Sequence, residues 1–253
     1  AFFVLYANID EFDPSKYSLD YKSLSVMDKW ILSKLNSLIK DVDSNLNDYK
    51  IQETSRVLED FIDQLSNWYV RRSRERFWEK GMPQDKINAY MTLYTCLDTF
   101  SKLSAPMIPF MSETIYQNIT RRVYSDAPES IHLCDFPVAD NSYIDFDLEE
   151  KMNQVLSIVV LGRNCRNSSN IKNRQPIAGI YIKSANKPLS DFYIDIIKDE
   201  LNSKAVEFIT DSDKFISFSF KPQLRTLGRR FGKDLNTVKE ILASLDGNAA
   251  MHE

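Results

Sequence analysis

Glycine is scarce in the first two thirds of this chain. The 253 residues contain six glycines, and only Gly81 precedes position 162. Tight turns and β-hairpins usually need glycine, because it adopts positive backbone φ angles without steric cost. So long a stretch with so little glycine predicts long helices joined by few tight turns.

Apolar residues in this region recur with the 3.6-residue period of amphipathic helices. Ser25 can cap the first helix, because Asp28 lies three residues further on, as in a capping box. Pro106 and Pro109 must end or bend the third helix, since proline lacks an amide hydrogen and clashes with the preceding turn. The predicted helices cover residues 26–47, 52–79, 85–103, 110–119 and 148–167.

The pattern changes near residues 168–176. Three later segments resemble strands, and two resemble amphipathic helices. The predicted strands are 178–184, 205–210 and 215–221, and the predicted helices are 189–202 and 234–247. The fold class is therefore mainly α, with a helical bundle over residues 25–170 followed by a small α+β unit over residues 171–253.

Charge and cysteine usage limit the possible functions. The net charge is −4, so any nucleic-acid binding must come from a local cationic patch. Cys96, Cys134 and Cys165 are odd in number and far apart, and the only histidines are His132 and His252. A disulfide framework or a zinc site is therefore not expected, and a reducing, cytosolic compartment fits. The start AFFVLYANID, without Met and without a basic leader, indicates a piece of a longer protein.

The stretch NWYVRRSRERFW, residues 67–78, stands out because it holds four arginines and two of the three tryptophans. At about 100° per residue, Trp68, Arg72 and Arg76 continue the apolar arc of the predicted 52–79 helix. A guanidinium on that arc needs a carboxylate partner, because an unpaired buried charge is costly. The opposite, available face carries Asn67, Arg71, Arg74 and Trp78.

Two interpretations of the available face stay open at this point. Cations at a helix C-terminus are common and are usually just solvated. An indole among arginines also suits stacking on an unpaired base, with guanidiniums on nearby phosphates. Trp78 favours the second interpretation, because a solvated helix end has no need of an exposed indole. The ring also favours a single strand, since binding to a double strand would not require it.

Two further stretches, 163–176 and 221–233, are rich in cations and contain no acidic residue. Each alone is consistent with a polar linker, but together with the arginine–tryptophan block they favour phosphate binding. The first stretch holds Arg163, Arg166, Lys172 and Arg174.

Catalytic arrangements are nearly absent from the sequence. No glycine-rich phosphate cradle occurs. His132 and Cys134 would share one face of a strand, and a nucleophile pair is conceivable. A buried structural pair is the favoured interpretation, because no activating acid or oxyanion donor is indicated nearby.

Three segments, MDKWILSKLNSLIKDVDSNLNDYKI, FIDQLSNWYVRRSRERFW and YTCLDTFSKLSAPMIPFMSETIYQNI, resemble the anticodon-binding domain of class I isoleucyl-tRNA synthetases. FFVLYANIDEFDP resembles the segment by which that family leaves its catalytic core, so residues 1–24 are expected to be this connection. LGRNCRNSSNIKNRQPI, FKPQLRTLGRRFGK and LDGNAA resemble its C-terminal junction. The resemblance thus covers essentially the whole chain.

The resemblance implies a parent enzyme that uses ATP with Mg to attach isoleucine to its tRNA. HIGH and KMSKS occur nowhere in the sequence, so this chain is expected to be inactive alone, with no catalytic residue, metal site or cofactor. The expected partners are isoleucine tRNA and the catalytic core of the same polypeptide. A cytoplasmic monomer without membrane contact is expected.

The resemblance also implies roles for individual residues of the arginine–tryptophan block and of the stretch 163–176. Trp78 would stack on a base, and Arg71 and Arg74 would contact phosphates or base edges. The expected tRNA-binding residues are Asn67, Arg71, Arg74, Trp78, Arg163, Arg166, Lys172, Arg174 and Gln175. The residues expected to support the site are Trp68, Arg72 and Arg76.

Other functions compete with tRNA binding. The bundle is also compatible with a protein-interaction scaffold, or with the equivalent domain of a valyl- or leucyl-type synthetase, which shares the DxWILSxL pattern. A docking groove for a partner helix should expose aliphatic anchors, whereas a nucleic-acid site should expose cations with an aromatic ring. The available face of residues 67–78 favours nucleic acid. A hydrolase built on His132 and Cys134 is the least favoured alternative.

Overall fold

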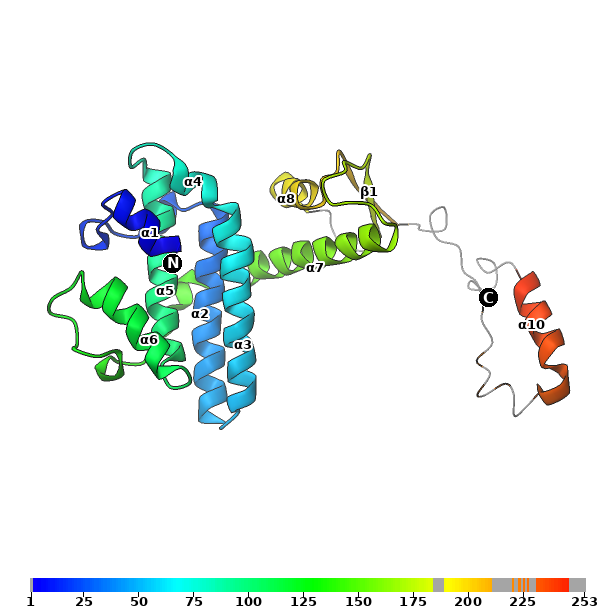
Figure 1. The fold of residues 1–253 in the computed structure, drawn as a ribbon, viewed down its shortest axis with the longest axis horizontal. Helices are drawn as coiled ribbons and strands as arrows, with labels where there is room; N and C mark the ends of the chain where they lie inside the picture. The colour runs from blue at the N-terminus through cyan, green and yellow to red at the C-terminus, as the bar shows by residue number, and fades with distance from the viewer. Residues whose placement is uncertain are drawn as a thin grey trace. The chain divides into compact units, whose positions relative to one another are not determined.

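The computed structural model describes residues 2–183, 189–210 and 231–245, together with residues 220, 223, 225 and 227. The chain divides into two compact units, Ala1–Asn153 and Gln154–Glu253 (Figure 1). The division falls inside the long helix α7 (Phe146–Ser168). The domain limits expected at residues 24 and 170 stay predictions.

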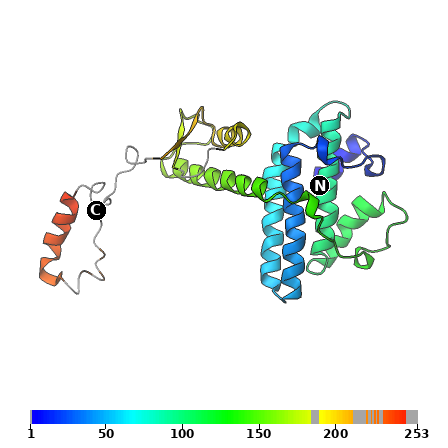
Figure 2. The ribbon, with the colours of Figure 1, turned by 180° about the vertical axis from the view of Figure 1, so that it is seen from behind.

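The first unit is a bundle of helices. α2 (Val26–Asn47) and α3 (Ile51–Gln64) lie side by side, as Figures 1 and 2 both show, and α5 (Gln84–Ser104) packs against α2. The other helices that contribute to this unit are α1 (Phe2–Ile9), α4 (Arg74–Trp78), α6 (Pro109–Tyr116) and the start of α7. Between them lie π-helical segments at Leu65–Val70 and Gln117–Arg121, and 3₁₀ turns at Pro14–Lys16, Tyr21–Ser23, Ile131–Leu133 and Asn141–Tyr143.

Helix α2 begins where its capping residues predict. Ser25 Oγ accepts a hydrogen bond from the Asp28 amide at 3.2 Å, and Asp28 Oδ2 accepts one from the Ser25 amide at 3.1 Å. This reciprocal capping box satisfies two amides that would otherwise lack partners in the helix. Trp30 and Val42 on the inner face are fully buried, so α2 is a central element of the bundle.

The prediction of one continuous helix over residues 52–79 is wrong in its second half. α3 passes into the π-helical segment Leu65–Val70, and a turn at Ser73 precedes α4. The wider π turn and the Ser73 turn interrupt the regular helix between Tyr69 and Phe77, which are both buried. Periodicity could not reveal this change, because it assumes a constant rotation per residue.

Pro106 and Pro109 separate two helices. α5 ends at Ser104, and Pro109 occupies the first turn of α6, where its missing amide hydrogen costs nothing. The hydroxyls of Ser104 and Ser112 lie 3.1 Å apart and join the end of α5 to α6. The short helix predicted at 110–119 is confirmed, with its last residues in π geometry.

The second unit contains a small parallel sheet. β1 (Ile180–Lys183) pairs with β2 (Val206–Ile209), with Ile180 opposite Val206. Helix α8 (Asp191–Leu201) lies between the two strands in sequence, as a parallel pair requires. A 3₁₀ turn at Gly232–Asp234 and helix α10 (Leu235–Ser244) follow. The predicted fold class is confirmed, whereas the strand predicted at 215–221 lies, apart from Phe220, outside the described residues.

One helix contact in the second unit requires glycine. A Cβ atom at position 162 would lie 2.4 Å from Cδ1 of Leu201, the last residue of α8. Leu201 is 1% exposed, so its side chain cannot turn away into solvent. Helix α7 therefore meets α8 at a position that has no side chain.

We expect Gly162→Ala to lower the stability of the second unit. Overpacking against Leu201 costs about 1–3 kcal/mol, and alanine returns at most about 1 kcal/mol through helix propensity. Gly179→Ala is the matched control, since its Cβ would meet only Ala205 atoms at 3.8 Å or more. Hydrogen exchange of α8 in urea measures the difference, and equal protection in the two variants would contradict the account of this contact.

Candidate nucleic-acid interface

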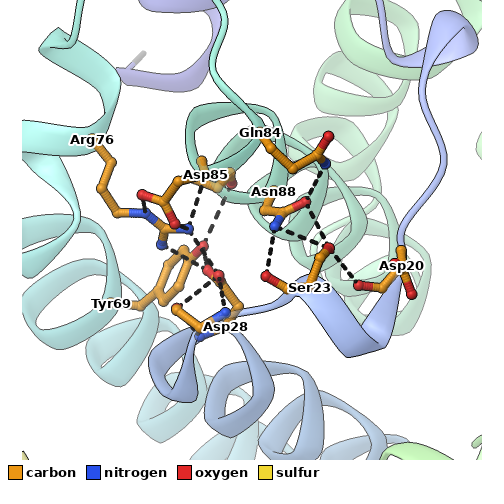
Figure 3. Close-up of polar contacts among 10 residues, drawn as sticks. Asp20, Ser23, Asp28, Tyr69, Arg76, Gln84, Asp85 and Asn88 are labelled. Atoms are coloured by element: carbon orange, nitrogen blue, oxygen red, sulfur yellow. Dashed lines mark hydrogen bonds and ion pairs between the residues drawn. The ribbon is translucent and has the colours of Figure 1, made fainter.

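Arg76, the inner arginine of the block, binds two carboxylates (Figure 3). Its Nη1 and Nη2 donate to Asp28 Oδ1 and Oδ2 at 2.8 Å each, which makes a bidentate pair. Its Nε donates to Asp85 Oδ2 at 2.7 Å. Tyr69 Oη and Ser25 Oγ add hydrogen bonds to Asp28 at 2.6 and 2.7 Å. The structure thus supplies the carboxylate partners that the position of Arg76 requires.

Electrostatics keep this cluster charged at neutral pH. Burial by itself would raise the pKa of Asp28, but the hydrogen bonds and charge of Arg76, helped by Tyr69 and Ser25, outweigh burial and lower that pKa. Burial would lower the pKa of Arg76, but its bonds to Asp28 raise it instead. Burial, and then the charge of Asp28, raise the pKa of Tyr69 well above its ordinary value. Tyr69 therefore stays a neutral donor to a charged pair.

The opposite face of the block is exposed. Arg71 and Arg74 are both exposed, and Arg71 Nε donates to the Asn67 carbonyl at 2.8 Å. Asn67 is also exposed, and its Nδ2 donates to Asp63 Oδ1 at 2.5 Å. The inward-facing members Trp68, Arg72 and Arg76 are buried or half-buried. The structure therefore has the two faces that the sequence predicts, while the RNA contacts themselves stay predictions.

Trp78 ends α4 and is 56% exposed. Its Nε1 donates to Tyr6 Oη at 2.8 Å, so α1 holds one edge of the indole. The surface beside it is nearly flat and is lined by Glu75, Arg76, Trp78 and Glu79. Carboxylates repel phosphates and accept hydrogen bonds, so Glu75 and Glu79 make this surface less purely cationic.

Sequence reasoning missed two features of this site. Tyr6 lies far away in sequence, and no pattern connects it with Trp78. Glu75 and Glu79 lie three residues before and one residue after Trp78 in the sequence. That they lie beside the indole depends on α4 being a short separate helix, which the sequence did not predict. The site is therefore less purely cationic than the block suggests.

Arg166, on α7 in the second unit, was expected to bind tRNA, but the structure gives it a structural role. It is 4% exposed, and its Nη1 donates to the Leu201 carbonyl at 3.1 Å. Its Nη2 donates to the carbonyls of Lys172 and Gln175. A guanidinium enclosed in this way cannot reach a phosphate. Arg166 instead ties the turn after α7 to the end of α8.

The other predicted residues of this stretch lie nearer the surface. Arg163 Nη2 pairs with Glu200 Oε2 at 2.6 Å and keeps 41% of its side chain exposed. Lys172, Arg174 and Gln175 are exposed, and their contacts with tRNA stay predictions. Most of the cationic stretch 221–233 lies outside the described residues.

The structure bears on the His132–Cys134 pair and on metal binding. His132 and Cys134 lie in and after a 3₁₀ turn and not on a strand, and His132 is exposed, so the predicted buried pair is wrong. Within the described ranges, no group of three or more His, Cys, Asp or Glu residues is placed to hold a metal ion. No helix in this described part of the chain has the length and apolarity that a bilayer crossing needs.

Comparison with known proteins identifies the class to which this helical bundle belongs. Residues 28–182 match the family model described as the anticodon-binding domain of tRNA ligase, and the chain is a member of that family. The match begins at Asp28, the carboxylate that holds Arg76, and includes the whole arginine–tryptophan block.

More closely, the chain matches isoleucine–tRNA ligases. It is 51% identical to that of Clostridium novyi over 246 residues, 97% of this chain and 23% of the relative. Identity is 49% over 246 residues with the enzyme of Clostridium acetobutylicum and 39% over 249 residues with that of Cytophaga hutchinsonii, each again over 97% of this chain. The chain spans 24% and 22% of the lengths of these two relatives. The resemblance to isoleucyl-tRNA synthetases is confirmed.

We expect Asp28→Asn to lower the free energy of unfolding of the first unit by about 3 kcal/mol at pH 7, because it unbalances a buried ion pair. The folded pKa of Asp28 lies below its unfolded value of about 3.9. The stabilisation is therefore fully present above that value and is lost as pH falls through the folded pKa. Urea unfolding of the wild type and the variant should converge at low pH.

Asp48→Asn is the control for this comparison. It removes the ion pair between Lys50 and Asp48, whose side chains are 52% and 56% exposed and 2.7 Å apart. Solvent screens such a pair, so its loss should leave unfolding unchanged. An equal loss of stability in both variants would contradict the importance given to Asp28.

Proposed function

We propose that this chain binds the anticodon stem-loop of an isoleucine tRNA, with Trp78 as the stacking surface for an unpaired base. The family match and the names of the relatives support this proposal. The ATP-dependent attachment of isoleucine would belong to other regions of a longer cytoplasmic enzyme, since HIGH and KMSKS do not occur in this sequence. The role of this chain would be recognition.

The observation that carries the proposal is the exposed indole of Trp78 on α4, where the exposed Arg74 lies four residues earlier on the same side of the helix. Most tryptophans bury their rings, and the other two in this chain, Trp30 and Trp68, are 0% and 7% exposed. A ring that is 56% exposed beside cations is the arrangement that single-stranded RNA recognition uses. Phosphates would meet the arginines, and a splayed base would meet the indole.

The charge of the exposed side chains changes from α3 to the residues around α4. On α3 the exposed side chains include four acids, Glu53, Glu59, Asp60 and Asp63. Beyond them the exposed side chains are mixed, with three cations, Arg71, Arg74 and Lys80, against two acids, Glu75 and Glu79. A polyanion is repelled by the acids of α3 and meets a small excess of positive charge beyond them, so the tRNA would approach the α4 end of the bundle. Lys172 and Arg174 would add separate phosphate contacts in the second unit.

A protein partner is less consistent with this surface. The two nearest exposed residues before Trp78 are Arg74 and Glu75, the two nearest after it are Glu79 and Lys80, and all four are charged. A groove for an amphipathic helix needs apolar anchors at regular spacing. The change in charge and the indole together favour RNA.

We expect Trp78→Ala to weaken binding of an isoleucine-tRNA anticodon stem-loop by about 5- to 150-fold, which corresponds to the ~1–3 kcal/mol that stacking contributes per base. Trp78→Phe should lose less, because it keeps a ring. Fluorescence anisotropy of a labelled stem-loop measures both. A loop with another anticodon should bind the wild-type chain more weakly.

Arg74→Ala should reduce the slope of log K against log salt by about 0.7, the amount expected for one phosphate contact on a single strand. Arg56→Ala is the matched control, because Arg56 is an exposed arginine on α3 among the acidic residues. If Arg56→Ala and Arg74→Ala reduce the slope equally, the cations act only through net charge. If Trp78→Ala binds like the wild type, the proposed stacking is wrong.

A further inference from the structure

The orientation of Trp78 depends on α1, a helix distant in sequence. Tyr6 Oη accepts the indole Nε1 hydrogen at 2.8 Å, across 72 positions of sequence. The indole has one polar edge, and this bond fixes that edge toward α1. The exposed remainder of the ring is therefore presented in one direction.

Tyr6 is itself held by aromatic packing. Its ring lies 4.8 Å from that of Phe2, one turn earlier on α1. Phe2 meets Phe77 edge to face, with centroids 5.2 Å apart, and Phe77 precedes Trp78 on α4. Phe77 is 1% exposed and packs edge to face on Tyr90 of α5 at 4.8 Å. The two ends of the Tyr6–Trp78 hydrogen bond thus rest on one cluster of rings.

A second set of contacts holds the chain just after Trp78. Lys86 is almost fully buried, and its Nζ donates to the Glu79 carbonyl at 2.8 Å. The same Nζ lies 2.8 Å from Asp10 Oδ2, which also accepts a hydrogen bond from Tyr90 Oη at 2.5 Å. Asp10 directly follows α1, so α1 and α5 together hold the end of α4.

Helix α4 needs this support because it has only five residues. A helix that short has little stability of its own, since its nucleation cost is not repaid by enough hydrogen bonds. The turn at Ser73 also separates it from the longer helical stretch before it. Without contacts from outside, Trp78 would be free to take several orientations.

We propose that Tyr6 is a positioning residue for RNA binding: its hydroxyl holds the indole of Trp78 in the orientation that a stacked base requires. This inference rests on the proposed function. A surface fixed before binding avoids the entropic cost of ordering the side chain in the complex. Tyr6 would therefore contribute to affinity without necessarily contacting the RNA.

Tyr6→Phe tests this, because it keeps the ring on Phe2 and removes only the acceptor. We expect stem-loop affinity to fall about 3- to 10-fold, in the range of one lost hydrogen bond. The indole N–H signal of Trp78 in a ¹H–¹⁵N spectrum should shift, while those of Trp30 and Trp68 should not. Trp78→Phe assigns that signal by removing it.

The controls separate positioning from general damage. Tyr17→Phe removes a hydroxyl from the same N-terminal region, where the ring stacks on Phe12 at 5.5 Å, and should bind like the wild type. In a Trp78→Ala background, Tyr6→Phe should cause no further loss, because the side chain that it positions is gone. A purely structural role for Tyr6 would lower affinity in both backgrounds.

The results distinguish the two proposals. If Trp78→Ala weakens binding and Tyr6→Phe binds like Tyr17→Phe, the positioning role is overturned and the stacking role stands. Additive losses in the double variant would also overturn it. If Trp78→Ala has no effect, the proposed function fails and this inference fails with it. A loss with Tyr6→Phe only where Trp78 is present supports the inference.

Discussion

The bidentate ion pair between Arg76 and Asp28 is the contact that holds α4 in place at the end of the bundle formed by α2 and α5. It joins α4 to the first turn of α2, and the additional bond to Asp85 joins both to α5. A buried ion pair pays a large desolvation cost, so it stabilises a fold only when every remaining hydrogen-bonding position is satisfied. Tyr69 and Ser25 satisfy those positions on Asp28.

This ion pair also explains how the short helix α4 can both pack against the bundle and present side chains to solvent. Arg76 and Phe77 face the bundle and fix α4, so Arg74 and Trp78 on the same short helix must face outward. The capping box at Ser25 uses the same Asp28 carboxylate, so the start of α2 and the position of α4 are set by one residue. The contacts of Arg76 and Phe77 thus determine where Arg74 and Trp78 lie. A substitution on the buried side of α4 is therefore expected to change the exposed side as well.

Much of the fold could be predicted from the sequence, because capping, proline positions and apolar periodicity act over a few residues. The start of α2 at Val26 follows from such local rules, and the two prolines predicted either a bend or the break found between Ser104 and Pro109. The π segment at Leu65–Val70 could not be predicted, since apolar periodicity assumes a constant rotation per residue, and its Tyr69 bonds to Asp28, 41 positions away. The Tyr6–Trp78 bond and the bond from Arg166 to the Leu201 carbonyl were not visible either, because these partners lie 72 and 35 positions away.

The central claim is that the α4 end of the bundle is the surface that meets RNA. Chemical-shift mapping of the chain with an isoleucine-tRNA anticodon stem-loop tests it directly. The account predicts changes at the Trp78 indole and the guanidiniums of Arg71 and Arg74, with little change at the far end of α3, where Tyr49 and Ile51 are exposed. Changes concentrated around Tyr49 and Ile51, with the Trp78 indole unaffected, would contradict it.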